Sequence, residues 1–300
     1  MASEKIEFTL YKGRVVVRFF PDSHMYFVSV DGGKFIRKGG VTKIIGIKDK
    51  SVPLGKWYQQ ITADFLLSLI EKGVPLNHEL AIEAAVQNEV IFSEAKDIGT
   101  EAHEWCEHFI KHQLKEPGFD KLPDMPERKG AVVGVNAFLE WWESNDIKPI
   151  SSEKIVYSLK DDYIGTMDAG AKINKIMSLI DFKTSNGLYN SVRLQTLGYM
   201  DADEEEQGKK IYKQRWAIRL SKFTEEEYMQ KEERKKEIKK IIAKVKGWNY
   251  KEYPIKPYQA FEAMCLDTNK EDMARDRQGF ACAMGLFRWD KETDFYTHGK

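Results

Sequence analysis

The chain has 300 residues, 42% of them hydrophobic and 12% aromatic, which is enough for one large domain or two modest ones with a buried core. Its 47 basic and 47 acidic residues balance, so any surface that binds a polyanion has to be local. No run approaches the length of about 20 apolar residues that spans a bilayer, and no secretory signal is visible. A cytoplasmic protein without a membrane partner is therefore expected. The three cysteines lie far apart, which predicts reduced thiols.

Residues 6–47 are predicted to form short antiparallel strands. Apolar and β-branched runs alternate there with turn sequences such as Pro21-Asp22 and Asp31-Gly32-Gly33. From Leu54 to about Val90 apolar residues recur every fourth position, which is typical of helices.

Two more helices are expected in the next segment. The first is predicted to open near Gly99-Thr100 and to end near Gln113, before a loop rich in proline and glycine. The second covers residues 130–144, and one buried stripe at helical spacing is predicted on it: Val135, Phe138, Leu139 and Trp142.

Residues 153–221 read as the core of the fold. Three successive strands are predicted at 153–159, 166–173 and 177–183, followed by a helix over 191–202 and a fourth strand over 215–220. The fourth strand alternates, with Trp216, Ile218 and Leu220 on one face. On its other face, Arg215 and Arg219 form either a row that faces DNA or a solvated surface.

The tail beyond the fourth strand is predicted to be helical, because Ile238, Ile241, Ile242 and Val245 recur at helical spacing within a run of charges. Together the elements indicate an α/β (α+β) fold with a mixed central sheet flanked by helices. We expect an N-terminal segment of strands and helix over 1–96, a core over 97–221 and a helical C-terminal segment over 222–300 that packs on the core.

Asp181 and Lys183 form the first candidate site pair. Residues i and i+2 of a strand project to the same face, so a carboxylate and an ammonium lie side by side. The acid-x-Lys pattern alone has no value, because other tripeptides of this chain match it, among them 127–129, 146–148, 233–235 and 237–239.

Context favours Asp181, because only this acid ends an apolar run, 176–180, that looks like a central strand. A carboxylate in such a place is costly to desolvate unless positive charge compensates it. Asp168 lies on the adjoining strand of a hairpin that is predicted to turn at Asn174-Lys175. Antiparallel neighbours are about 5 Å apart, so both aspartates are expected to reach one hard cation such as Mg²⁺ or Mn²⁺.

These residue types fit phosphodiester hydrolysis. The reaction needs a water held in line with the leaving oxygen and positive charge over the developing phosphate oxygens, and a divalent cation on two aspartates supplies both. Lys183 is expected to orient or deprotonate that water and to stabilise charge.

Four further residues are candidates. Gln195 and Tyr199 are four apart and share one face of the helix after the strand. His103 stands early in the helix expected from Gly99, where an imidazole can add a nitrogen ligand. Glu153 begins the first core strand.

The order of these motifs resembles the RecB-like exonuclease branch of the PD-(D/E)XK nucleases. The motifs are Gly-x-x-x-His at 99–103, a glutamate that opens a strand at 153, Gly-Thr-x-Asp at 165–168, Asp-Phe-Lys-Thr at 181–184 and Gln-x-x-x-Tyr at 195–199. The same branch includes phage recombination exonucleases and the mitochondrial genome-maintenance exonuclease. Residues 24–27 and 40–42 also resemble single-domain phage members, whereas nothing beyond about 221 is recognised.

The resemblance implies a restriction-endonuclease-like core and a DNA exonuclease that depends on Mg²⁺ or Mn²⁺, acting in DNA recombination, repair or replication-end processing. His103, Asp168, Asp181 and the main-chain carbonyl of Phe182 would be metal ligands, with Glu153 as a secondary acidic position. Lys183 would be catalytic, and Gln195 and Tyr199 would support the site or touch DNA. The partners implied are DNA and a single-strand annealing or recombination protein. Relatives with an iron–sulfur cluster use four cysteines, so no cluster is expected here.

Two other hypotheses stay open. The chain fits a structure-selective endonuclease that cuts junctions or flaps, and circular single-stranded DNA separates this from a strict exonuclease. It also fits a catalytically inactive DNA-binding module on the same fold. The intact set of Asp168, Asp181 and Lys183 argues against the inactive module.

Overall fold

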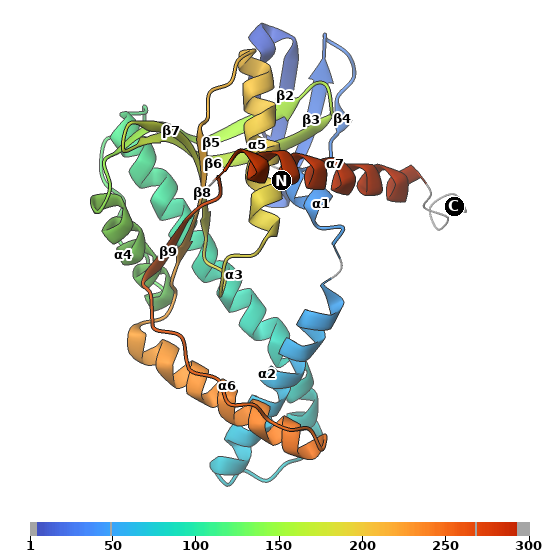
Figure 1. Cartoon of the computed structure of the whole chain (residues 1–300), viewed down its shortest axis with the longest axis vertical. Coiled ribbons are helices and arrows are strands. Elements are labelled where there is room, and N and C mark those ends of the chain that lie inside the picture. Colours follow the sequence, from blue (N-terminus) through green and yellow to red (C-terminus); the bar gives the residue numbers. More distant parts are fainter. Residues whose placement is uncertain (1–4, 49, 268, 293–300) are drawn as a thin grey trace.

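The fold is mixed α/β. The computed structural model describes residues 5–48, 50–267 and 269–292, and within them it contains two sheets and seven α-helices (Figure 1). None of the helices in these ranges combines the length and apolar character that crossing a bilayer requires.

The predicted N-terminal strands form an antiparallel sheet of their own. Inward residues such as Val17 and Val28 pack against Ile155, Tyr157 and Ile164 of the central sheet, which fixes this small sheet on the core. Its strands follow chain order: β1 (Ile6–Leu10), β2 (Val15–Phe20), β3 (Met25–Val30) and β4 (Ile36–Arg37).

The central sheet has five strands and is mixed, as predicted. Its order is β5 (Ile147–Ser158), β6 (Tyr163–Ile173), β7 (Ile176–Lys183), β8 (Gln214–Leu220) and β9 (Phe261–Cys265). Only β7 and β8 run parallel; the other neighbours are antiparallel. The hairpin between β6 and β7 turns at Asn174 and Lys175, both at positive φ, which confirms the predicted turn.

Helices cover both faces of the central sheet. Ile180 and Leu179 are consecutive on β7 and point to opposite faces. Ile180 belongs to the cluster with the aromatic residues of α3 and α4, and Leu179 to the cluster with α1, α5 and α7. The helices are α1 (Val41–Ile45), α2 (Ser51–Glu71), α3 (His78–Leu114), α4 (Lys129–Glu143), α5 (Ser191–Gln207), α6 (Glu225–Val245) and α7 (Lys270–Glu292).

The expected helix start near Gly99 is wrong, because α3 runs without a break through this glycine. A β-carbon at Gly99 would lie 2.6 Å from Oγ1 of Thr184, so the glycine serves a close approach between α3 and the end of β7. The predicted division at 96 and 97 consequently falls inside one helix. Figure 1 shows α3 running from the central sheet down to α2 and α6.

Two expectations about the C-terminal third are also corrected. The tail is not purely helical, because β9 adds an edge to the central sheet beside β8. The apolar stripe predicted on α6 is incomplete: Ile238 is buried, whereas Val245 is 82% exposed.

Arg215 is buried. The predictions that it faces DNA or forms part of a solvated surface are therefore both wrong. Its side chain is 0% exposed, and Nη2 lies 2.6 Å from Asp267 and 2.7 Å from Asp276. A buried guanidinium needs such partners, and both come from the C-terminal segment. The other arginine of this face, Arg219, pairs with Glu262 of β9 at 3.2 Å.

Candidate active site

Asp181 and Lys183 lie side by side near the end of β7. Nζ of Lys183 is 2.5 Å from Oδ2 of Asp181, and the aspartate is 0% exposed whereas the lysine keeps 27% of its side-chain surface. The lysine approaches outside hydrogen-bond geometry, so both carboxylate oxygens of Asp181 lack a hydrogen-bond partner among the described residues. Asp181 is therefore a buried carboxylate with one close cation, and its two oxygens can still coordinate a metal ion.

Asp168 is tied to the same strand from β6. Its Oδ2 accepts a hydrogen bond of 2.7 Å from the main-chain N–H of Phe182. The Phe182 ring points the other way and lies in the aromatic cluster with Phe138 and Trp141. The ring thus anchors the strand in the core while the main chain of Phe182 stays at the site.

His103 reaches the same place from α3. Its Nδ1 is 4.0 Å from Oδ2 of Asp168, and its ring lies beside the main chain of Phe182. Loss of hydration and the charge of Lys183 lower the pKa of His103 to about 4. A neutral imidazole is the form that binds a metal ion.

Glu153 lies opposite Asp168, between the paired positions Ser152 with Ala169 and Lys154 with Met167. Its φ of 45° is in the left-handed region, which costs a residue other than glycine free energy and marks a local distortion of β5. Loss of hydration and the negative charge of Asp168 raise the pKa of Glu153. The secondary acid is therefore held close to the first aspartate.

Tyr199 and Gln195 approach from α5. Nε2 of Gln195 donates a hydrogen bond of 2.9 Å to the Tyr199 hydroxyl, and Thr42 of α1 lies beside the same hydroxyl. Burial and the charge of Asp181 raise the pKa of Tyr199, which is 4% exposed. The ring packs against Gly165, where a β-carbon would lie 2.4 Å from Cε1. The Gly-Thr-x-Asp and Gln-x-x-x-Tyr motifs thus meet in space.

The donor set fits a divalent cation. Loss of hydration raises the pKa values of Asp181 and Asp168, and the charge of Lys183 is the largest effect that opposes this at both carboxylates. The carboxylates of the buried Asp181 and the partly buried Asp168, an imidazole and a main-chain carbonyl are ligands that Mg²⁺ or Mn²⁺ accepts. Both carboxylate oxygens of Asp181 lack a hydrogen-bond partner among the described residues. In the part of the chain that is described, no three acidic, histidine or cysteine side chains already stand in a metal-binding arrangement. Binding would therefore require side-chain rotations, beginning with the Lys183 ammonium that now covers Asp181.

Glu107 was not identified from the sequence. Its negative charge raises the pKa values of Glu153 and Asp168, so it lies near the acidic end of the site, where it is paired with Lys111. The signal was available, because Glu107 follows His103 by four residues and therefore shares its helix face. Tyr26 was missed as a neighbour of the site: its hydroxyl and that of Thr166 are 2.8 Å apart.

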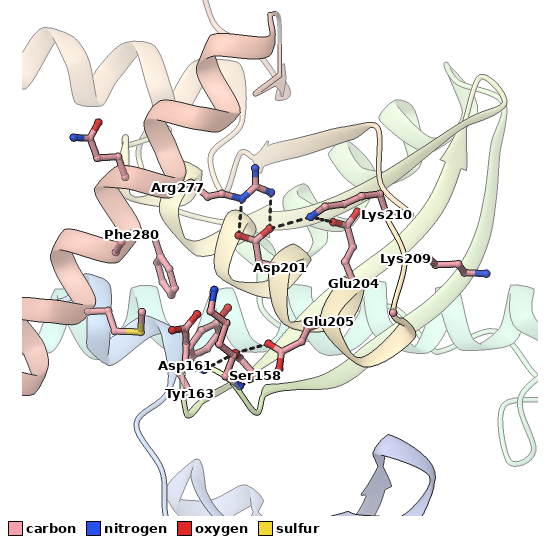
Figure 2. Close-up of a pocket in the computed structure, with 15 residues that line it drawn as sticks. Ser158, Asp161, Tyr163, Asp201, Glu204, Glu205, Lys209, Lys210, Arg277 and Phe280 are labelled. Atoms are coloured by element: carbon pink, nitrogen blue, oxygen red, sulfur yellow. Dashed lines mark hydrogen bonds and ion pairs between the residues drawn. The ribbon is translucent and has the colours of Figure 1, made fainter.

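A separate cavity of about 810 Å³ lies between the C-terminal half of α5, the middle of α7 and the turn that joins β5 to β6, and none of the predicted site residues lines it (Figure 2). Two of its carboxylates have cationic partners, since Arg277 binds Asp201 and Lys210 binds Glu204 at 2.7 Å. Glu205 accepts hydrogen bonds from the Ser158 hydroxyl and the Lys160 main-chain N–H, and no three described acids of the cavity stand in a metal-binding arrangement. The acids of this cavity therefore do not form a second candidate metal site.

The motifs predicted from the sequence thus converge on one place, where β6, β7, β5, α3 and α5 meet. Comparison of the sequence with models of known protein families and with curated proteins gives no match. The likeness to the PD-(D/E)XK nucleases consequently rests on these residues and their arrangement.

Proposed function

We propose that the protein is a DNA nuclease of the PD-(D/E)XK type that depends on Mg²⁺ or Mn²⁺, with a restriction-endonuclease-like core formed by the central sheet and its flanking helices. The observation that carries the proposal is the buried Asp181, whose carboxylate meets Lys183 on the same strand and Asp168 on the next. A cytoplasmic exonuclease in recombination, repair or replication-end processing fits the motifs best.

Asp168, Asp181, His103 and the Phe182 carbonyl would hold the metal, with Glu153 in support. A bound divalent cation would supply positive charge over the phosphate oxygens and help to activate the attacking water. Lys183 would orient that water and stabilise negative charge as the phosphodiester bond breaks. Tyr199, which is buried, would support the site through its packing on Gly165 rather than by touching DNA.

The other acid-x-Lys tripeptides do not compete. Two of them lie in α6, where residues i and i+2 do not share a face. Asp146 and Lys148 are both exposed at the start of β5. They therefore serve as a matched control for Asp181 and Lys183.

The test is digestion of end-labelled linear DNA and of circular single-stranded DNA with Mg²⁺, with Mn²⁺ and with EDTA. The proposal predicts cleavage of linear DNA that needs metal and is lost in Asp181→Asn but kept in Asp146→Asn. Cleavage that persists in EDTA, or in Asp181→Asn, would contradict it. Equal cleavage of circular DNA would instead favour the structure-selective endonuclease. Metal-independent DNA binding without cleavage would favour the inactive module.

A further inference from the structure

The N-terminal sheet has an outer face, which points away from the central sheet. Successive side chains of a strand project to opposite faces, so the neighbours of the inward-facing Val17 and Val28 lie on this outer face. In Figure 1 the sheet lies at the opposite end of the molecule from α2 and α6. The strand register places one row of side chains across all four strands of the outer face: Glu7, Arg18, Phe27 and Arg37.

Three phenylalanine rings lie on the outer face. The rings of Phe20 and Phe27 have their centroids 5.6 Å apart and stand at 76° to each other. The Arg18 guanidinium lies over the Phe35 ring, 3.7 Å from its centroid. All three rings are half-buried, and none belongs to an apolar cluster of the described residues. The solvated face of an antiparallel sheet is ordinarily polar, so three partly open rings on it indicate a binding surface.

The same face is basic. Residues 5–38 contain seven lysine and arginine residues and three acidic residues, which gives a net charge of plus four in a chain whose total charge is zero. Glu7 pairs with both Lys5 and Arg18, at 3.3 and 2.7 Å. The exposed Arg37 takes part in none of the ion pairs of the described residues in this sheet. Positive charge is therefore in excess on the outer face, which suits phosphate groups.

Rings interleaved with cations fit an unpaired nucleic-acid strand. Aromatic side chains stack on free bases while cations hold the backbone phosphates, and the face of a sheet can carry two or three such bases. The bases of a duplex are stacked on one another and are not open to the rings. A second copy of the chain fits the face less well, because a two-fold contact would set the cations of one face against those of the other.

Strand β3 connects the outer face with the candidate site. Phe27 points outward, whereas the preceding Tyr26 points inward, where its hydroxyl is 2.8 Å from that of Thr166. Thr166 is two residues before Asp168 and therefore shares its face of β6. One layer of the fold, the N-terminal sheet, thus separates the outer face from the candidate metal ligands.

Resting on the nuclease function proposed above for the choice of DNA, we propose that the outer face holds an unpaired DNA strand. The bases stack on Phe20, Phe27 and Phe35, and the phosphates lie near Arg18 and Arg37. The outer face takes part in binding and not in the breaking of bonds. It keeps a single-stranded part of the substrate attached to the protein and favours DNA that has such a part over blunt duplex.

The first arm of the test uses the unchanged protein without metal. A thymine-rich strand that carries iodouracil in place of thymine is bound in EDTA and irradiated with long-wave ultraviolet light, which joins the halogenated base to a ring stacked on it. Mass spectrometry of the peptides is expected to find the link at Phe20, Phe27 or Phe35. Links at other peptides alone would overturn the proposal.

The second arm measures the affinity for the same strand in EDTA by fluorescence anisotropy. Phe27→Leu with Phe35→Leu removes two rings but keeps their apolar character, so the dissociation constant is expected to rise roughly tenfold or more. Phe27→Tyr with Phe35→Tyr keeps the rings and should bind as the wild type does. Phe92→Leu is the matched control, because its ring is 63% exposed on α3, away from the sheet. Equal affinity of the double leucine variant and the wild type would overturn the proposal.

The outcomes separate this proposal from the nuclease function. Weaker binding by the double leucine variant, together with no metal-dependent cleavage by the wild type, would uphold the outer face as a DNA-binding surface and reject the nuclease. Cleavage by the wild type with unchanged binding by the variant would do the reverse. Sedimentation completes the test: a wild-type dimer that the double leucine variant loses would assign the face to a second copy and overturn the proposal.

Discussion

The main-chain N–H of Phe182 donates a hydrogen bond of 2.7 Å to Oδ2 of Asp168, so the aspartate of β6 is oriented by the strand that carries Asp181. Asp168 is thereby held by a main-chain donor, whereas Asp181 has no hydrogen-bond partner in the described part of the chain and has Lys183 as its close cation. The two carboxylates should respond differently to mutation, as should the aspartate and the lysine of β7.

Lys183→Ala should separate catalysis from metal binding. Both aspartates remain, so the metal and DNA affinities should change little, while the rate of cleavage falls by roughly 10²–10⁴ because a positioned charge is lost. Asp181→Asn should weaken metal binding itself. Calorimetry with Mn²⁺ and single-turnover cleavage measure the two effects, with Lys148→Ala as the control. If Lys183→Ala cleaves DNA at the wild-type rate, Lys183 has no catalytic role and its place beside Asp181 is a coincidence of sequence.

His103→Ala should raise the concentration of Mg²⁺ needed for half-maximal cleavage, because the imidazole is one of few donors beside Asp168. The fold should persist, since the side chain is 34% exposed. A Mg²⁺ titration of cleavage and a thermal melt are the measurements. If the titration curve matches that of the wild type, His103 is structural.

Gly165→Ala should lower the free energy of unfolding by about 1–3 kcal/mol, the usual range for overpacking. The added methyl group would meet the Tyr199 ring at 2.4 and 2.8 Å, and the buried ring has little room to move. Gly187→Ala is the control, because nothing lies within 4 Å of its new methyl group and its φ is not in the left-handed region. Urea denaturation measures the free energy of unfolding of both variants. Equal values would show that the Tyr199 ring moves aside and accommodates the methyl group at position 165.

Arg215→Met should destabilise the protein by about 3–5 kcal/mol, because two buried carboxylates, Asp267 and Asp276, lose their shared guanidinium. Arg14→Met breaks an exposed pair with Asp31 and should cost less than about 1 kcal/mol. Urea denaturation of both variants decides this prediction. If Arg215→Met lowers the free energy of unfolding no more than Arg14→Met does, solvent reaches Asp267 and Asp276 and replaces the guanidinium.

Lys231 of α6 lines a cavity of about 1110 Å³ whose wall includes Ser185–Leu188, close after Lys183. If DNA contacts this wall, binding of single-stranded DNA in EDTA should weaken as the pH rises from 7 to 9 at constant ionic strength. The pKa of Lys231 is lowered to about 8 by loss of hydration, Lys222 and Lys235, with Glu232 opposing, so its positive charge is present at pH 7 and mostly lost at pH 9. Lys231→Arg keeps its charge throughout and should remove most of this dependence. Fluorescence anisotropy measures the affinities. An equal pH response in the variant would place the titrating group elsewhere.

Local patterns predicted the centre of the fold well. The strands β6 and β7 and the turn at Asn174 and Lys175 follow from alternation and turn chemistry within one short segment. The aspartate of each strand could be located because one ends an apolar run and the other stands across the hairpin. Helix α4 was recovered from its apolar stripe for the same reason.

Contacts between distant segments explain the errors. Gly99 was read as a helix start, although it faces Thr184 from the middle of α3. Arg215 was read as a surface residue because its partners lie 52 and 61 residues further along the chain. β9 is five residues long, and its pairing with β8 across the whole of α6 leaves no local signal.

The unbroken α3 connects the part of the molecule around α2 with the candidate site through one continuous helix. At about 1.5 Å per residue, its 37 residues extend for roughly 55 Å, from the arm that it shares with α2 to the end beyond His103. The helix is continuous between Glu94 and His103, so a tilt of its outer part is expected to shift the imidazole two to three turns away. A tilt of α3 would therefore change the distance between His103 and Asp168, two of the residues that we propose hold the metal.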